Sequence, residues 1–114
     1  MIGYKGFDEY LRCRGMQYEI GKEYKKENES KKLSVCSDTG FHFCKEIRQV
    51  NEYYELSSNS KNRFCLVEAF GEIIEDTNKC ITDHIKILRE IKGEELDGLV
   101  GRVNGNTGIF NSGN

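Results

Sequence analysis

The stretch that most constrains the fold is residues 63–74, RFCLVEAFGEII, because it carries apolar side chains on both faces of an extended segment. Successive side chains of a strand point to opposite sides, so Phe64 lies on one face and Cys65 on the other. A strand with two apolar faces has to be covered on both of them, which places it centrally in a sheet. We expect the rest of the chain to be arranged around this strand.

Shorter strands are expected on either side of the central one. Alternation of apolar and polar residues indicates them, and glycine, asparagine and aspartate supply the turns because the chain has no proline. The segment 22–32 carries charges of both signs with almost no apolar content, which predicts a solvated hairpin loop. The further strands are predicted at residues 2–7, 16–20, 33–36, 41–44 and 80–91, with a helical turn or loop at 8–15 and one helical turn at 93–100.

Residues 40–54, GFHFCKEIRQVNEYY, place an aromatic strand directly before an amphipathic segment. Apolar side chains recur there at helical spacing, which predicts a helix over residues 46–56. The members of its apolar stripe are Ile47, Val50 and either Tyr53 or Tyr54. We therefore predict an α+β fold, a small, split, mostly antiparallel sheet with this one main helix beside it. The junction of such a strand and helix is a common place for a ligand.

Length and charge limit the classes of function. The 114 residues are enough for one domain, and 17 basic against 19 acidic residues give no strong signal for nucleic acid or an anionic membrane. There is no apolar run long enough to span a bilayer and no signal-peptide pattern at the N-terminus, so we expect a cytoplasmic protein.

The five cysteines form no CxxC pair, and we interpret them as reduced thiols. A zinc site drawn from Cys36, His42, Cys44 and Cys65 is the alternative. Its spacing matches no zinc ribbon or finger, so we expect no metal.

The sequence changes character after residue 100. Asn106, Thr107 and Gly108 match Asn111, Ser112 and Gly113 at a five-residue period. We predict a globular domain over residues 1–100, followed at 101–114 by the start of an Asn/Gly-rich pentapeptide-like repeat or by a flexible tail.

Asp83 lies in the predicted strand 80–91 on the same side as Ile85 and Ile87, so its carboxylate is expected to point inward. An inward carboxylate is either a hydrogen-bonded structural group or a site residue. The residues alone leave both interpretations open.

Several short motifs, in this order, resemble the ADP-ribosyltransferase superfamily in the branch of diphtheria toxin and the poly(ADP-ribose) polymerases. GFHF at residues 40–43 is similar to the glycine-aromatic strand of the nicotinamide pocket, and Tyr53 to the tyrosine that stacks on nicotinamide. LVEAFGE at 66–72 and TDHIKI at 82–87 resemble later strands of that fold. The resemblance implies an ADP-ribosyltransferase-like split sheet.

The resemblance also implies roles for individual residues. Asp83 occupies the place of the catalytic glutamate, and Lys5 in YKGF the place of a histidine or arginine. Val50 stands where the family has serine. These departures are expected to remove transferase chemistry while leaving a pocket. The ligand-binding residues implied are Tyr4, Lys5, Gly40, His42 and Tyr53.

The combination of GYKGF and GFHFC also resembles small domains carried by phages and prophages, sometimes ahead of repeat tails. This likeness implies an accessory role in the cytosol of a host cell.

Three functions follow as hypotheses. The first is a non-catalytic module of a phage or prophage that binds a host protein or a nucleotide-type ligand, with no required cofactor. The second is a small ADP-ribosyltransferase or NAD glycohydrolase that uses NAD and has Asp83 as its catalytic carboxylate. The third is a structural domain that caps a longer repeat array.

Overall fold

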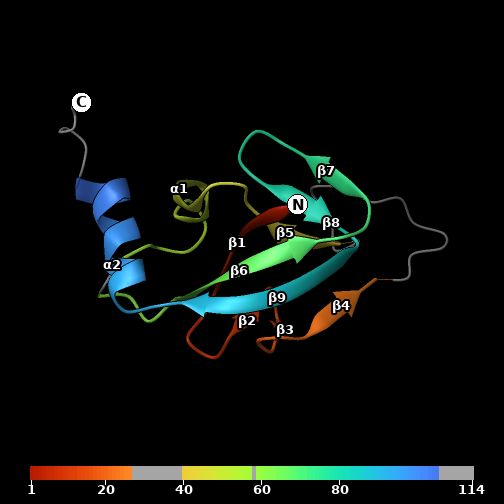
Figure 1. Cartoon of the computed structure of the whole chain (residues 1–114), viewed down its shortest axis with the longest axis horizontal. Helices are drawn as coiled ribbons and strands as arrows, with labels where there is room; N and C mark the ends of the chain where they lie inside the picture. Colours follow the sequence, from red (N-terminus) through yellow and green to blue (C-terminus); the bar gives the residue numbers. More distant parts are fainter. Residues whose placement is uncertain (27–39, 58, 106–114) are drawn as a thin grey trace.

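Strand β6 (Arg63–Ala69) is the central strand of the largest sheet, where it lies between β1 (Ile2–Phe7) and β9 (His84–Ile91) (Figure 1). The computed structural model describes residues 1–26, 40–57 and 59–105. Within these ranges the chain forms three antiparallel sheets and two short α-helices, so the α+β class with mostly antiparallel sheets is confirmed. The central place predicted for the strand at residues 63–74 is confirmed for residues 63–69, which form β6.

The strand order shows how distant parts of the chain meet. The largest sheet has the order β1-β6-β9-β4, and a second sheet has the order β5-β8-β7. A small hairpin pairs β2 with β3. The remaining elements are β2 (Arg12–Cys13), β3 (Met16–Gln17), β4 (Glu23–Lys25), β5 (Phe41–Phe43), β7 (Ile73–Glu75), β8 (Cys80–Thr82), α1 (Ile47–Val50), α2 (Glu94–Val100) and the π-helix η1 (Gly101–Gly105).

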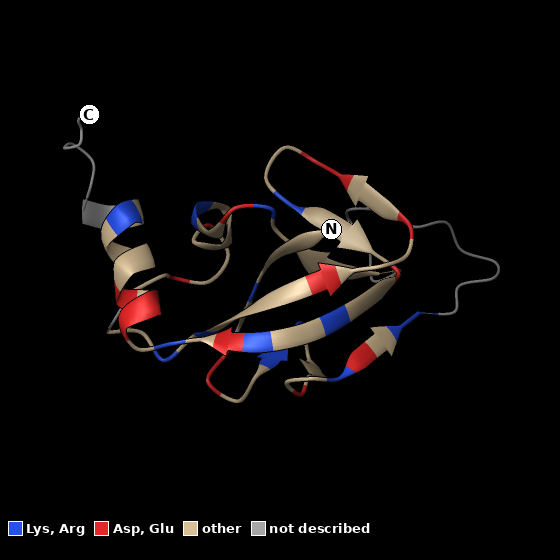
Figure 2. Cartoon of the chain, viewed as in Figure 1, with Lys and Arg blue, Asp and Glu red and all other residues tan. Residues whose placement is uncertain are grey.

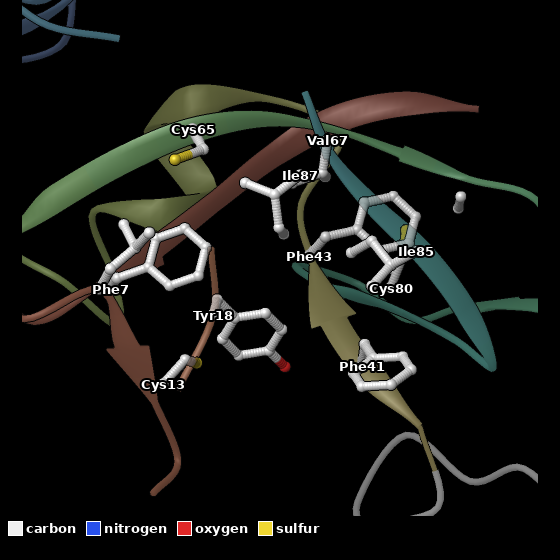
Figure 3. Packing of buried hydrophobic residues seen from close by; sticks show 12 residues of the cluster. Phe7, Cys13, Tyr18, Phe41, Phe43, Cys65, Val67, Cys80, Ile85 and Ile87 are labelled. Carbon is white, nitrogen blue, oxygen red and sulfur yellow. The ribbon is translucent and has the colours of Figure 1, made fainter. Parts of the chain in front are cut away.

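The main hydrophobic core lies between the largest sheet and β5, as Figure 3 shows for Phe7, Tyr18 and Phe41. These aromatic rings contact one another edge to face, with centroids 5.3 Å apart for Phe7 and Tyr18 and 6.3 Å apart for Tyr18 and Phe41. Strands β6 and β9 contribute Val67 and Ile87, both fully buried. Burial of each such side chain contributes about 1.5–3 kcal/mol, so this cluster fixes the packing of β5 on the large sheet.

A second, smaller cluster lies around Phe64 on the opposite face of β6. The buried side chains of Val50 and Leu56 from the α1 segment pack there, with Leu96 of α2 against them. Both faces of β6 are therefore covered, as its apolar pattern predicted. Figure 1 shows α2 at the end of the molecule opposite to β7 and β8.

Two strands predicted as continuous are divided between sheets. Residues 63–74 form β6 and β7, and residues 80–91 form β8 and β9 with a break at Asp83. Both segments pass between the large sheet and the three-stranded sheet, and their two crossing points lie next to each other. Phe70 N–H donates there to His84 O at 2.9 Å. The prediction that Asp83 shares an inward face with Ile85 is wrong, because the break resets the alternation.

The main helix is not where the sequence predicted it. Helix α1 covers only Ile47–Val50, and the chain continues in turns, with Asn51 Oδ1 accepting a hydrogen bond from Leu56 N–H at 2.7 Å. Tyr54, and not the exposed Tyr53, packs beside Val50. The longer helix is α2, which lies where only one helical turn was predicted. Arg89 on β9 donates two hydrogen bonds, of 2.7 and 2.9 Å, to the carboxylate of Glu95 in the first turn of α2.

Part of the predicted charged loop is a strand. Glu23–Lys25 forms β4 on the edge of the large sheet, because Tyr24 gives this polar segment aromatic contacts, with its ring centroid 4.9 Å from that of Tyr18 and 6.4 Å from that of Phe41. The predicted strand 16–20 is shorter than expected, and Ile20 is exposed. Segment 8–15 contains β2. Residues 27–32 of the predicted loop and the predicted strand 33–36 lie outside the described residues.

The boundary predicted after residue 100 falls inside a continuous helical segment. Helix α2 runs directly into η1, and Val103 packs against the Phe64 cluster. Val103 is apolar, like Leu96 and Val100 before it, and all three side chains pack against this cluster. The sequence repeat predicted from Asn106 onward lies outside the described residues.

Cys13, Cys44, Cys65 and Cys80 are free, as expected, and Cys36 lies outside the described residues. In the part of the chain that is described, no helix is both long and apolar enough to cross a bilayer.

Candidate functional site

A cavity of about 410 Å³ lies against β1, where the end of β5, the β2–β3 hairpin and the segment after α1 meet. We call it the Lys5 cavity. Its size is typical of small-molecule sites in proteins. Its walls are formed by Tyr4, Lys5, Gly6, Cys13, Arg14, His42, Phe43, Cys44, Val50, Glu52, Tyr53, Tyr54 and Lys79.

Lys5 is the most unusual of these residues, because its side chain is buried at 3 % exposure. Its side-chain nitrogen donates to His42 O at 2.5 Å and to Cys13 Sγ at 3.5 Å. The amine also lies 5.2 Å from the ring centroid of Tyr18 and 5.7 Å from that of Phe7. Burial lowers the pKa of Lys5 below its usual value, since removal from water disfavours the charged form.

Strand β1 brings Lys5 to this position through contacts on both of its edges. Its partner in β6 is Cys65, and on the other edge Tyr4 exchanges backbone hydrogen bonds of 2.7 and 2.8 Å with Cys44. This bridge joins the large sheet to the end of β5. Lys5 therefore faces the space that opens between the two sheets.

Glycine at position 6 lets the segment after α1 lie directly on β1. A Cβ atom at this position would be 2.8 Å from Cδ2 of Tyr54 and 2.9 Å from Cγ1 of Val50, closer than side chains pack. The close approach forms one wall of the Lys5 cavity.

The inner wall contains thiols and phenols that stay protonated at neutral pH. Burial raises the pKa of Cys44 to about 11. Burial and a hydrogen bond with Cys13 raise the pKa of Tyr54. These groups can donate hydrogen bonds to a ligand but carry no charge of their own.

The mouth of the cavity is polar and partly aromatic. Tyr53 is 48 % exposed, and Glu52 beside it accepts a hydrogen bond from Asn78 Nδ2 at 2.8 Å. Arg14 and Lys79 add positive charge at the rim. Charged residues of both signs are distributed over the chain, with acidic residues at the start of α2 and both acidic and basic residues along β9 (Figure 2).

A second cavity of about 230 Å³ adjoins the first and shares Lys5, Cys13, Arg14 and His42 with it. Gly40 lines this second cavity. The residues predicted to bind a ligand are thus brought together, since Tyr4, Lys5, His42 and Tyr53 line the Lys5 cavity and Gly40 lines its neighbour.

Asp83 is placed elsewhere. Its carboxylate accepts a hydrogen bond from Glu72 N–H at 3.0 Å and supports the turn between β6 and β7, while its backbone oxygen accepts from Lys26 N–H at 2.9 Å. Asp83 lines neither cavity. The structure therefore does not bring it together with Lys5 and Tyr53.

Sequence reasoning missed Cys13, Arg14, Glu52 and Lys79 among the cavity residues. The Arg14-Gly15 pair gave a weak signal, because Gly15 suggests a tight turn, and both residues have positive φ values of 53° and 81°. Glu52 and Lys79 gave none, since charged residues near turns are ordinarily solvated.

A family model described as a domain of unknown function, DUF7666, matches residues 1–98. The chain belongs to this family. The DUF7666 region contains every residue that lines the two cavities, and it ends inside α2. A comparison with curated proteins finds no match.

Proposed function

We propose that this protein is a non-catalytic binding module that holds a small nucleotide-type ligand in the Lys5 cavity. The observation that carries the proposal is the combination, in one cavity of about 410 Å³, of a buried lysine, an exposed tyrosine and a basic rim. Each feature suits one part of such a ligand.

The rim suits phosphate groups. Arg14 and Lys79 place cationic side chains at the mouth, and such side chains are the usual partners of phosphate oxygens. Tyr53 offers an aromatic surface at the same mouth, on which a nucleobase or nicotinamide ring can stack. Lys5 and the Tyr54 hydroxyl supply donors farther inside.

The ligand is bound but not turned over in this proposal. Oxocarbenium-like chemistry on NAD needs a carboxylate beside the sugar, and the residue that resembles the catalytic one, Asp83, supports a turn outside the cavity. Glu52 is the acidic residue in the cavity wall, and it lies at the exposed mouth.

An ADP-ribosyltransferase-like split sheet and a phage or prophage accessory role belong to the same proposal. Two observations support them: the junction of the two sheets at the Tyr4–Cys44 bridge, and the likeness of GYKGF and GFHFC to phage-borne domains. The split sheet and the accessory role both fit a protein that descends from a nucleotide-processing enzyme. Such a protein would retain the binding pocket and lack the catalytic activity.

The test is calorimetric titration with ADP-ribose and NAD, with nicotinamide release followed in the same samples. We expect binding without release, and weaker binding in Tyr53→Ala and Lys79→Ala. Tyr10→Ala is the matched control, because Tyr10 is also an exposed tyrosine, at 61 % against 48 % for Tyr53, and lines neither cavity.

Two results would contradict the proposal. Nicotinamide release that disappears in Asp83→Asn would show a transferase or glycohydrolase instead. Absence of binding to every nucleotide, with capture of a host protein that depends on the same residues, would show a protein-binding module.

A further inference from the structure

Lys5 is a buried lysine that has no acidic partner among the described residues. All seven ion pairs of the described residues involve other groups, and the side-chain acceptors of Lys5 are a backbone oxygen and a thiol. A charged group this deeply buried is costly unless a carboxylate balances it. The surroundings of Lys5 therefore favour the neutral amine.

The hydrogen bonds agree with a neutral amine. A neutral amine has two N–H groups and one lone pair, whereas an ammonium has three N–H groups. The Lys5 nitrogen has two acceptors within reach, His42 O at 2.5 Å and Cys13 Sγ at 3.5 Å. Both N–H groups are then used and the lone pair is left over. The lowered pKa of Lys5 is consistent with this count.

The amine is buried but not sealed off. Lys5 lines both the cavity of about 410 Å³ and its neighbour of about 230 Å³, so a small molecule in either one lies beside it. The amine also lies over the faces of Phe7 and Tyr18, so its surroundings are apolar on that side. Desolvated lysines in such surroundings are the ones that react with carbonyl carbons.

We propose that Lys5 is a nucleophilic amine that binds small aldehydes or ketones covalently as an imine. The nitrogen lone pair attacks the carbonyl carbon, and a proton moves from nitrogen to the carbonyl oxygen to give a carbinolamine. Loss of that hydroxyl with a second proton from nitrogen releases one water and leaves a C=N bond. The step needs no oxidant or reductant.

The neighbouring residues suit this step. Cys13 Sγ lies at hydrogen-bond distance from the amine, and Tyr54 forms a hydrogen bond with Cys13. Burial raises the pKa of Tyr54, so its hydroxyl is a proton donor in the same cavity as the nitrogen, where a carbonyl oxygen is converted to water. Arg14 and Lys79 outnumber Glu52 among the charged residues at the mouth, which favours carbonyl compounds that carry an anionic group. This inference goes beyond the proposed function and does not depend on nucleotide binding.

The experiment treats the whole folded protein at pH 7 with an equimolar amount of pyridoxal 5′-phosphate, an anionic aromatic aldehyde, and reduces the product with borohydride. Peptide mapping by mass spectrometry then locates the label. We expect Lys5 to carry at least about tenfold more label than Lys45, because the hydrogen bond with Glu75 raises the pKa of Lys45 and keeps that exposed amine almost entirely protonated at this pH. Lys45 is the internal control, being exposed and paired with Glu75 at 2.6 Å.

Two variants complete the test. Lys5→Met should lose the dominant label, and Lys45→Met should keep it. Because the map is made on the unaltered protein, the result stands even where Lys5→Met fails to fold. Label spread over exposed lysines, with Lys5 at or below their level, would overturn the proposal.

Discussion

Lys5 and Asp83 are two charged residues that the resemblance to ADP-ribosyltransferases assigns to one site, and the structure gives them opposite surroundings. Lys5 is buried beside aromatic rings and a thiol, at the junction of two cavities. Asp83 is half-buried at a turn, where its carboxylate accepts a backbone hydrogen bond. The Lys5 region has the features of a ligand site, and the Asp83 region those of a structural support.

The two regions also differ in the kind of close contact that their glycines make. At Gly3, two residues before Lys5 on the same strand, the close contact is with backbone, since a Cβ atom there would lie 2.6 Å from the backbone oxygen of Cys44. Around Asp83 the close contact of Gly71 is with the Asp83 side chain, which is able to rotate away. Substitutions at the two glycines therefore separate the regions.

The largest effect is expected from Gly3→Ala. The added methyl group cannot be accommodated without breaking the Tyr4–Cys44 bridge, so we expect a loss of about 3 kcal/mol in the free energy of unfolding, measured with urea. Gly71→Ala should cost less, and Gly98→Ala, which has open space in α2, should stabilise by about 0.5–1 kcal/mol. A Gly71→Ala loss larger than that of Gly3→Ala would reverse the comparison.

Asp83→Ala is expected to destabilise by about 1–2 kcal/mol, because Glu72 N–H loses a charged acceptor. The same variant should bind ADP-ribose with unchanged affinity, since Asp83 lines neither cavity. Chemical denaturation and calorimetry on one preparation measure both quantities. A weaker affinity in the folded variant would place Asp83 in the binding site after all.

Lys5 should make stability depend on pH in a definite direction. Its folded pKa is lowered, so between that pKa and about 10.5 the unfolded chain binds more protons than the native protein, and stability rises with pH. Relative to Lys5→Met, the unaltered protein should therefore gain stability as the pH is raised through this window. Urea unfolding at several pH values measures the difference, and a constant or falling difference would contradict a desolvated Lys5.

Tyr53→Ala should have the smallest effect on stability, within about 0.5 kcal/mol, because its ring is largely exposed. Loss of stacking should nevertheless weaken nucleotide binding by about 5-fold or more. Tyr54→Ala offers the contrast, since Tyr54 packs against both hydrophobic clusters and should lose stability as well. Equal stability losses in the two variants would show that Tyr53 is a packing residue.

Sequence patterns predicted the parts of this fold that depend on local alternation. Strand β1 has the bounds expected of it, and β6 is central because both of its faces are apolar. The breaks at residues 70–72 and at Asp83 could not be predicted, because the apolar alternation continues through them. Their cause is the passage from one sheet to another, which depends on distant partners.

The candidate site was predictable only in part. Its glycines and aromatic residues lie in short motifs that can be recognised along the chain. The burial of Lys5, in contrast, depends on Tyr18, Cys13 and Cys65, which come from other parts of the chain. Helix α1 is short for a similar reason. Asn51 Oδ1 accepts a hydrogen bond from Leu56 N–H in the turn that follows α1. This turn places the side chains of Val50 and Leu56 in the Phe64 cluster, so no longer helix is needed.

The most direct test of the account is an NMR titration of the protein with ADP-ribose, followed through the backbone amide signals. We predict shifts for the amides of Lys5, His42 and Tyr53, which lie on three segments around the Lys5 cavity, and none for Glu72 and Asp83. Shifts centred on Asp83, with the Lys5 cavity unaffected, would contradict the account.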